Sequence, residues 1–382
     1  MFKCRVLDNY RVYQVLKGKT MALFWWLLVW AMVATVGKGD KTSPVCFIFG
    51  DSLVDAGNNN YLQTLSRADI PPNGIDFKAS NGQPTGRYTN GRTIADIILE
   101  ELGQQNYPQP FLAPDTKGPS ILHGVNYASG GGGIMNQTGR IFVNRLGMSV
   151  QVDYFNTTRQ QLDQLLGKAQ AKEFLGKAIF SISIGSNDFL NNYLLPVFST
   201  GERILETPDE FVGNLIDNLR EQLARLYNLD ARKFVVGNVG PIGCIPYQKT
   251  INQVGENECA SLPNQLAMHY NERFRDLMTE LNERLPGAKF VLANVYDIVM
   301  ELITNYQYYG FESASVSCCR NGPFSGIIPC GPTSSMCADR TKYLFWDPYH
   351  PSEAANLIVA KFLVDGDTKY ISPVNIRHLV HH

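Results

Sequence analysis

Short apolar runs alternate with longer amphipathic segments along most of the chain. The apolar runs are rich in β-branched and aromatic residues, as is typical of strands that are buried on both faces of a sheet. We predict strands at residues 45–50, 123–129, 178–185, 233–239 and 288–296. We predict helices near residues 92–102, 147–168, 209–228, 263–285 and 352–364. This alternation predicts an α/β fold in which helices cover both faces of a parallel sheet.

The N-terminal segment has a different pattern. Residues 22–36 read "ALFWWLLVWAMVATV", an almost wholly apolar run that two lysines precede. A helix that crosses a bilayer takes roughly 20 apolar residues, so this run is short for a membrane span. We predict a signal peptide over residues 1–38, cleaved within 34–39, with an uncleaved signal anchor as the alternative. No linker interrupts the later pattern, which predicts a single exported domain over 39–382 with no membrane span after cleavage.

The cysteines agree with export. Cys4 lies in the predicted signal peptide, and Cys46 lies in the first predicted strand, where we expect a buried thiol. The other six are disulfide candidates: Cys244, Cys259, Cys318, Cys319, Cys330 and Cys337. We expect the first two to pair, because they are close in sequence, and the adjacent third and fourth to bond to the last two in either order. A zinc site is the weaker alternative, because the chain has no CxxC pair with a nearby histidine and exported proteins favour disulfides.

The charge balance bears on the choice of partner. The 382 residues carry a formal net charge of -1. This balance argues against nucleic acid as the main partner, since phosphate binding needs a basic surface. Two sequons, at Asn136 and Asn156, are candidates for N-glycosylation of an exported chain.

Small and polar residues follow the predicted strands. Ser52 lies in the Gly-Asp-Ser turn after the first strand, four glycines at 130–133 follow the second, and Asn187 follows the third. In open parallel sheets the site lies at the carboxyl ends of the strands. Ser52 is therefore the candidate nucleophile. A serine hydroxyl needs a base within hydrogen-bond reach, and without one this serine would be only a turn residue.

His350 is the candidate base. Asp347 lies three positions before it, Pro348 favours a turn between them, and Pro351 holds His350 extended. Such a turn can bring the carboxylate to one imidazole nitrogen and leave the other nitrogen for Ser52. The other histidines lie in a polar tail, in a predicted helix or at the start of a strand, and we expect no catalytic role for them. Taken alone, a D-x-x-H motif is weak evidence and more often marks a helix-capping loop.

Acyl transfer also needs hydrogen-bond donors for the oxyanion. The glycines at 130–133 let the backbone approach a ligand closely, because they have no Cβ. The Asn187 amide and the Ser52 backbone N–H are the other candidate donors. The alternative roles are a flexible turn for the glycines and a helix cap for Asn187. We expect Asp51 and Asp55 to brace the nucleophile turn rather than to act as bases.

Four blocks that occur in this order resemble the GDSL esterase/lipases of the SGNH hydrolase superfamily, and above all their plant secreted branch. The blocks read "FGDSLVDAGNNN", "NYASGGGGI", "IGSNDF" and "WDPYHPSEAAN". The stretches "PTGRYTNGRTIADII" and "NVGPIGCIP" are also similar to that branch. The resemblance covers roughly residues 44–377.

The resemblance implies a flavodoxin-like, three-layer α/β/α sandwich with a five-stranded parallel sheet. It implies catalytic roles for Ser52, Asp347 and His350 in a carboxylic ester hydrolase, an esterase or lipase that forms an acyl-Ser52 intermediate. The substrate would be a small or polymeric ester of a lipid or another acyl compound. The family needs no cofactor and no metal. Its plant secreted members act outside the cell, in the apoplast or cell wall.

The resemblance also implies an oxyanion hole made by the N–H of the nucleophile, Gly131 and Asn187. The family's spacing from Asn126 favours Gly131 within the glycine block, with Gly130 as the alternative. One small departure is Gly132, where the family often has alanine.

Other classes fit less well. The chain lacks the G-x-S-x-G of α/β-hydrolases, the G-x-x-x-x-G-K-[ST] of P-loop kinases and the H-E-x-x-H of metalloproteases. Three alternatives share the expected fold. The first is an acyltransferase, in which a substrate alcohol replaces water, and the second is a carbohydrate acetylesterase. The third is an inert exported binding protein, which we would expect to lack one of the three catalytic side chains.

Overall fold

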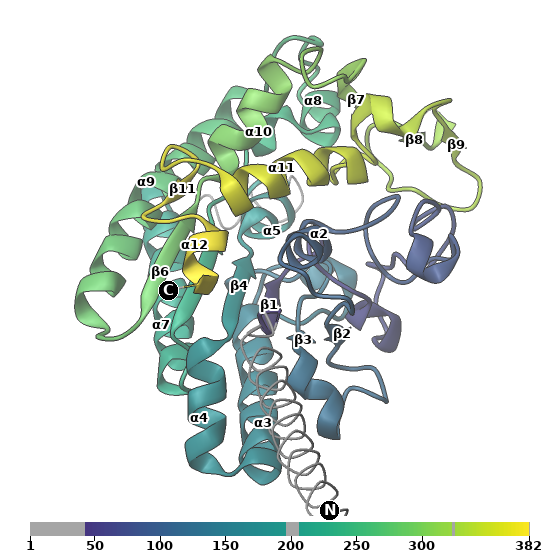
Figure 1. Cartoon of the computed structure of the whole chain (residues 1–382). Helices are drawn as coiled ribbons and strands as arrows, with labels where there is room; N and C mark the ends of the chain where they lie inside the picture. The colour runs from purple at the N-terminus through teal and green to yellow at the C-terminus, as the bar shows by residue number, and fades with distance from the viewer. Residues whose placement is uncertain (1–42, 196–205, 323–324, 382) are drawn as a thin grey trace, which may run out of the picture. The chain divides into compact units, whose positions relative to one another are not determined.

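A mostly parallel sheet forms the middle layer of the protein (Figure 1). The computed structural model describes residues 43–195, 206–322 and 325–381, and within them the sheet has seven strands in the order β11-β6-β5-β4-β1-β3-β2. The strands are β1 (Cys46–Gly50), β2 (Gln109–Pro110), β3 (Val125–Asn126), β4 (Ile179–Ser183), β5 (Lys233–Gly237), β6 (Lys289–Ala293) and β11 (Ile371–Ser372). Only β11 is antiparallel to its neighbour within this sheet. The predicted α/β fold is confirmed.

A row of aromatic side chains crosses the sheet. Phe47, Phe180, Phe234 and Phe290 lie at paired positions on four adjacent strands. Neighbouring ring centroids are 5.3, 5.7 and 4.2 Å apart, and all four side chains are buried. Because side chains alternate along a strand, the residues on either side of this row face the opposite layer. The row therefore fixes which face of each strand meets which helices.

Helices cover both faces of the sheet (Figure 1). One face packs against α3 (Met148–Leu166), α4 (Lys168–Lys177), α7 (Pro208–Asn228) and α9 (Ser261–Arg284). The other face packs against α2 (Ile94–Glu101), α10 (Val295–Thr304), α11 (Glu353–Asp365) and α12 (Ile376–His381). Two short helices, α5 (Ser186–Asp188) and α8 (Pro246–Ile251), lie in the loops that follow β4 and β5. The three layers agree with the predicted sandwich.

The helix starts follow from local sequence. Thr93 and Asp96 form a capping box at α2, in which each side chain accepts a hydrogen bond from the backbone N–H of the other. Thr207 and Glu210 do the same at α7, with Pro208 at the first helical position. These devices place the helix ends close to the predicted boundaries.

The sheet has two strands more than the predicted five. Both β2 and β11 are only two residues long, so they have no alternating or apolar run that sequence patterning could detect. The predicted strand at 288–296 also runs too far, because β6 ends at Ala293 and Asn294 caps α10 by accepting from the Asp297 N–H. The predicted signal peptide lies outside the described residues. None of the described helices is long and apolar enough to cross a membrane.

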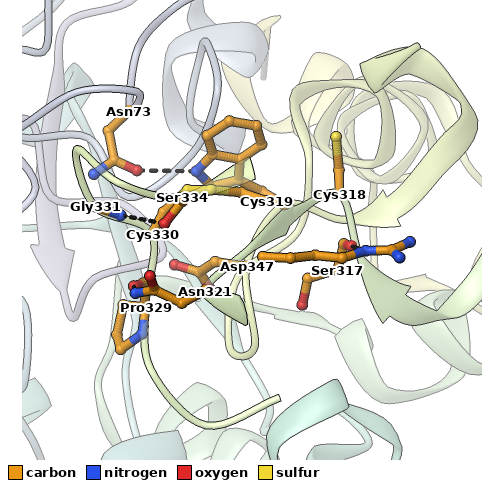
Figure 2. Close-up of a disulfide and its surroundings, with 12 residues drawn as sticks. Asn73, Ser317, Cys318, Cys319, Asn321, Pro329, Cys330, Gly331, Ser334 and Asp347 are labelled. Atoms are coloured by element: carbon orange, nitrogen blue, oxygen red, sulfur yellow. Dashed lines mark hydrogen bonds between the residues drawn. A yellow bond between two sulfur atoms is a disulfide. The ribbon is translucent and has the colours of Figure 1, made fainter. Parts of the chain in front are cut away.

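Three disulfides link the six candidate cysteines. The pairs are Cys244–Cys259, Cys318–Cys337 and Cys319–Cys330. The last two join the segment between β7 (Ser313–Ser317) and β8 (Cys319–Arg320) to the loop around β9 (Ser335–Met336). The strand β10 (Tyr343–Phe345) pairs with β7. Figure 2 shows the Cys319–Cys330 bond close to Asp347. The disulfide-rich loop is thus attached to the segment that carries the candidate acid.

Candidate active site

The candidate nucleophile lies in a tight turn at the carboxyl end of β1. Gly50, the last residue of the strand, donates its N–H to Gln151 Oε1 at 2.9 Å and accepts from Gln151 Nε2 at 2.8 Å. A Cβ at Gly50 would lie 2.4 Å from the carbonyl oxygen of Ser183, so only glycine fits there. The Asp51 N–H donates to that same carbonyl at 3.1 Å. The turn is therefore held on both sides, and Ser52 follows it at the wall of a cavity.

Ser52, His350 and Asp347 form a continuous hydrogen-bonded line. Ser52 Oγ lies 2.8 Å from His350 Nε2, although the two residues are 298 positions apart in the chain. His350 Nδ1 lies 2.8 Å from each carboxylate oxygen of Asp347. Asp347 Oδ1 also accepts the backbone N–H groups of Tyr349 and His350 at 2.8 Å. Both Asp347 and His350 are buried, so this carboxylate is kept from water and fixed in one orientation.

The turn that carries Asp347 and His350 is closed by its flanking strand and helix. The Trp346 N–H donates to the His350 carbonyl at 2.8 Å, and the Trp346 indole N–H donates to Asn73 Oδ1 at 2.9 Å. Ser352 caps α11 by accepting from the Ala355 N–H. The indole is fully buried against the disulfide-bonded cysteines. Residues far apart in the sequence thus hold the imidazole in place.

The geometry favours Gly131 over Gly130 as the candidate oxyanion donor. The Gly130 N–H is already used, because it donates to Asp55 Oδ2 at 3.0 Å. The Gly131 N–H makes no hydrogen bond to a described residue, and Gly131 lines the cavity. Gly131 has φ +82, and a Cβ on it would lie 2.4 Å from a ring carbon of Phe142. This position therefore needs glycine, and we take Gly131 rather than Gly130 as the candidate donor.

The Asn187 amide is oriented by two contacts. Its Nδ2 donates to the Gly132 carbonyl at 2.9 Å, and its Oδ1 accepts from Asn191 Nδ2 at 2.5 Å. A primary amide has two N–H donors, so one of them remains after the bond to Gly132. Asn187 is buried and lines the cavity together with Ser52. The remaining N–H is thus available to an oxygen bound beside the serine.

Buried carboxylates brace the turns around these groups. Asp55 accepts the N–H groups of Gly57 and Asn58 at 2.7 and 2.8 Å, in addition to that of Gly130. Asp188 accepts the N–H groups of Ile134 and Met135 at 2.8 and 3.0 Å. Burial raises the pKa of each carboxyl to about 6. These two aspartates join the nucleophile turn and α5 to the glycine block.

Asp51 also supports the nucleophile turn, and two further supporting residues were not predicted from the sequence. Asp51 Oδ1 accepts the Leu53 N–H at 3.0 Å, and burial raises the Asp51 pKa to about 7. Gln151 and Asp188 were not predicted as supports of the site. Gln151 is fully buried on α3 among apolar neighbours, and a polar residue on the apolar face of a predicted helix is the signal that could have identified it.

The two glycosylation candidates are not part of the cavity lining. Asn136 and Asn156 are both exposed, Asn136 in the loop before α3 and Asn156 within it. Their glycosylation stays a prediction. Within the described ranges, no group of three or more histidines, cysteines or acidic residues could hold a metal ion.

Comparison with known proteins agrees with the geometry. The sequence model of the GDSL-like Lipase/Acylhydrolase family matches residues 46–363. The chain is 66% identical to the GDSL esterase/lipase At2g23540 of Arabidopsis thaliana, over 94% of this chain and 95% of that protein. It is 59% identical to the GDSL esterase/lipase At3g50400 of the same plant, over 94% and 96% of the two chains.

The chain therefore belongs to the GDSL lipase/acylhydrolase family and is a carboxylic ester hydrolase.

Proposed function

We propose that this protein is a secreted serine esterase that cleaves acyl esters through an acyl-Ser52 intermediate. The observation that carries the proposal is the line of 2.8 Å contacts from Asp347 through His350 to Ser52. A serine becomes a useful nucleophile only when a base can take its proton, and this contact places the base within reach. The line ends at a cavity of about 600 Å³, which falls within the usual size of a small-molecule site.

In the first half of the reaction, His350 Nε2 takes the proton of Ser52 Oγ as that oxygen attacks the ester carbonyl carbon. The carbonyl oxygen becomes an oxyanion, which accepts from the N–H groups of Ser52 and Gly131 and from the Asn187 amide. When the tetrahedral intermediate collapses, the C–O bond to the alcohol breaks. His350 gives the proton to the departing oxygen, and the acyl group stays on Ser52.

In the second half, a water molecule takes the place of the alcohol. His350 removes a proton from that water as it attacks the acyl-serine carbonyl. Collapse of the second tetrahedral intermediate returns the proton to Ser52 Oγ and releases the carboxylic acid. The role of Asp347 in both halves is to hold the imidazole with Nδ1 protonated and to stabilise the imidazolium.

Export is supported by the apolar N-terminal segment and by the cysteines. Disulfides persist in oxidising compartments and are rare in the cytosol. Six cysteines of the chain lie in three bonds. Since the relatives reported above are plant proteins, the apoplast or cell wall is the proposed location.

The test is Ser52→Ala, assayed on p-nitrophenyl butanoate, with Ser261→Ala as the matched control. Ser261 is an exposed serine at the start of α9, outside the cavity. We expect Ser52→Ala to lose turnover while its circular dichroism and thermal unfolding stay those of the wild type, and Ser261→Ala to keep full activity. A folded Ser52→Ala enzyme with full activity would contradict the assignment. Product analysis with added alcohol measures how much acyl group goes to water and how much to the acceptor.

A further inference from the structure

The cavity continues past Ser52 along two helices, beyond the carboxyl ends of the sheet strands. Its inner half is lined by Val299 and Leu302 of α10, by Ala355 and Val359 of α11, and by Leu344 of β10. Leu302, Leu344 and Ala355 are each 1% exposed. These walls belong to the apolar layer on one face of the sheet. The inner half is thus a channel that leads from the serine into the core, which we call the inner channel.

The sequence builds the inner channel from small side chains at helical spacing. Val295, Val299 and Leu302 recur at the i, i+4, i+7 positions of α10 and so share one face of that helix. Ala355 and Val359 are four residues apart on α11 and also share a face. Valine or alanine stands at four of these five positions and takes less room than leucine or phenylalanine would.

The polar side chains beside the inner channel are already paired. Asn356 Nδ2 donates to the Arg92 carbonyl at 3.1 Å. Asn238 Nδ2 donates to Asn294 Oδ1 at 3.0 Å, and Asn238 Oδ1 accepts the Tyr296 N–H at 3.0 Å. A hydrocarbon chain would leave none of these groups unpaired. A sugar would bury hydroxyls against apolar walls, which is costly without hydrogen bonds.

The outer half of the cavity has a different character. It lies on the side of Gly131 and Asn187 and is bordered by Leu65, Phe142 and Leu190. Leu65 is 75% exposed, so this half opens to solvent. A departing alcohol, including one attached to a large molecule, has room to leave on this side. The buried inner channel offers no such exit and suits an unbranched apolar group.

We propose that the inner channel binds the acyl chain of the substrate, so that the enzyme prefers esters of medium- or long-chain aliphatic acids over acetyl esters. This inference rests on the proposed function and adds its substrate class. In this assignment the ester carbonyl lies at Ser52, the hydrocarbon chain passes between α10 and α11, and the alcohol faces the open outer half. It argues against the carbohydrate acetylesterase alternative, because an acetyl group would leave the channel unoccupied.

The experiment compares kcat/KM for p-nitrophenyl esters from acetate to decanoate. For the wild type we expect a rise of about fourfold for each methylene that enters the inner channel, which is the factor that burial of one CH₂ implies, and then a plateau. Val299→Phe should narrow the channel and move the plateau to shorter chains. Val299→Ala should extend the plateau to longer chains.

Ile303→Phe is the matched control, since Ile303 lies on the same helix, is half-buried and does not line the cavity. It should keep the wild-type dependence on chain length. A wild type that prefers acetate would overturn the inference, and so would Val299 variants that keep the wild-type profile while folded. Either result leaves the serine mechanism intact if Ser52→Ala is inactive on acetate. Activity that survives in Ser52→Ala would instead remove the proposed function itself.

Discussion

Removal of the Asn187 amide tests the oxyanion geometry. One of its N–H groups is used by the Gly132 carbonyl at 2.9 Å, and in the proposed mechanism the other donates to the oxyanion. Loss of one such donor lowers kcat by roughly 10²–10³, about 2.7–4 kcal/mol of barrier. We expect Asn187→Ala to show this loss with little change in KM, because the charge develops only in the transition state.

The same substitution also leaves the Gly132 carbonyl without its partner, which costs about 1–3 kcal/mol of stability. Thermal unfolding measured beside kcat and KM separates the two effects. Asn191→Ala is the companion variant, because it removes the contact that orients Asn187 Oδ1 but keeps both amide donors, so its loss of kcat should be smaller. A stable Asn187→Ala enzyme with kcat within about threefold of the wild type would refute this reasoning.

Three further predictions concern the surroundings of the site. Gly131→Ala would place a methyl group 2.4 Å from the Phe142 ring on a residue with φ +82, so kcat should fall. Addition of Phe142→Ala should recover part of the lost kcat. Equal kcat of the single and double variants would show that the clash with Phe142 is not the cause. The double variant Cys319→Ser, Cys330→Ser opens an 11-residue loop, which should lower the free energy of unfolding in urea by about 3 kcal/mol. It should also lower kcat, because the Cys319 N–H donates to the carbonyl of Trp346, next to Asp347. Unchanged stability and kcat would show that the loop does not support the acid. Burial raises the Asp51 pKa from 3.8 to about 7. The folded protein therefore keeps this proton at pH values where the unfolded chain has lost it. The contribution of Asp51 to the free energy of unfolding is greatest below about pH 4 and falls as pH rises toward 7. The unfolding free energy of Asp51→Asn relative to the wild type should therefore increase between pH 4 and 7; a constant difference would contradict the raised pKa.

The sequence predicted the central strands because each is a buried apolar run between turn residues. Such a run predicts a strand without knowledge of its neighbours, as for β1, in which all five residues are buried. The strands β2 and β11 could not be predicted in this way. Each is two residues long and forms only because it pairs with a neighbouring strand. Their formation depends on tertiary packing rather than on local pattern.

Within the candidate site, the sequence indicated residue types but not contacts. The order of the Cys318 and Cys319 bonds was open because adjacent cysteines point in directions that only the fold determines. Family spacing favoured Gly131, but the residues alone left Gly130 as an alternative. The structure distinguishes the two glycines by the bond from the Gly130 N–H to Asp55, a contact between positions 75 residues apart. The residues around either position do not indicate this hydrogen bond.

The most direct test of the central claim is covalent labelling with an organophosphonate ester, read by peptide mass spectrometry alongside residual activity. The reagent bonds to a serine oxygen that a neighbouring base activates. We predict one adduct per protein, located on Ser52, with activity falling in proportion to the labelled fraction, and no adduct at that position in His350→Gln. Complete inactivation with Ser52 unlabelled, or full activity with Ser52 labelled, would contradict the account.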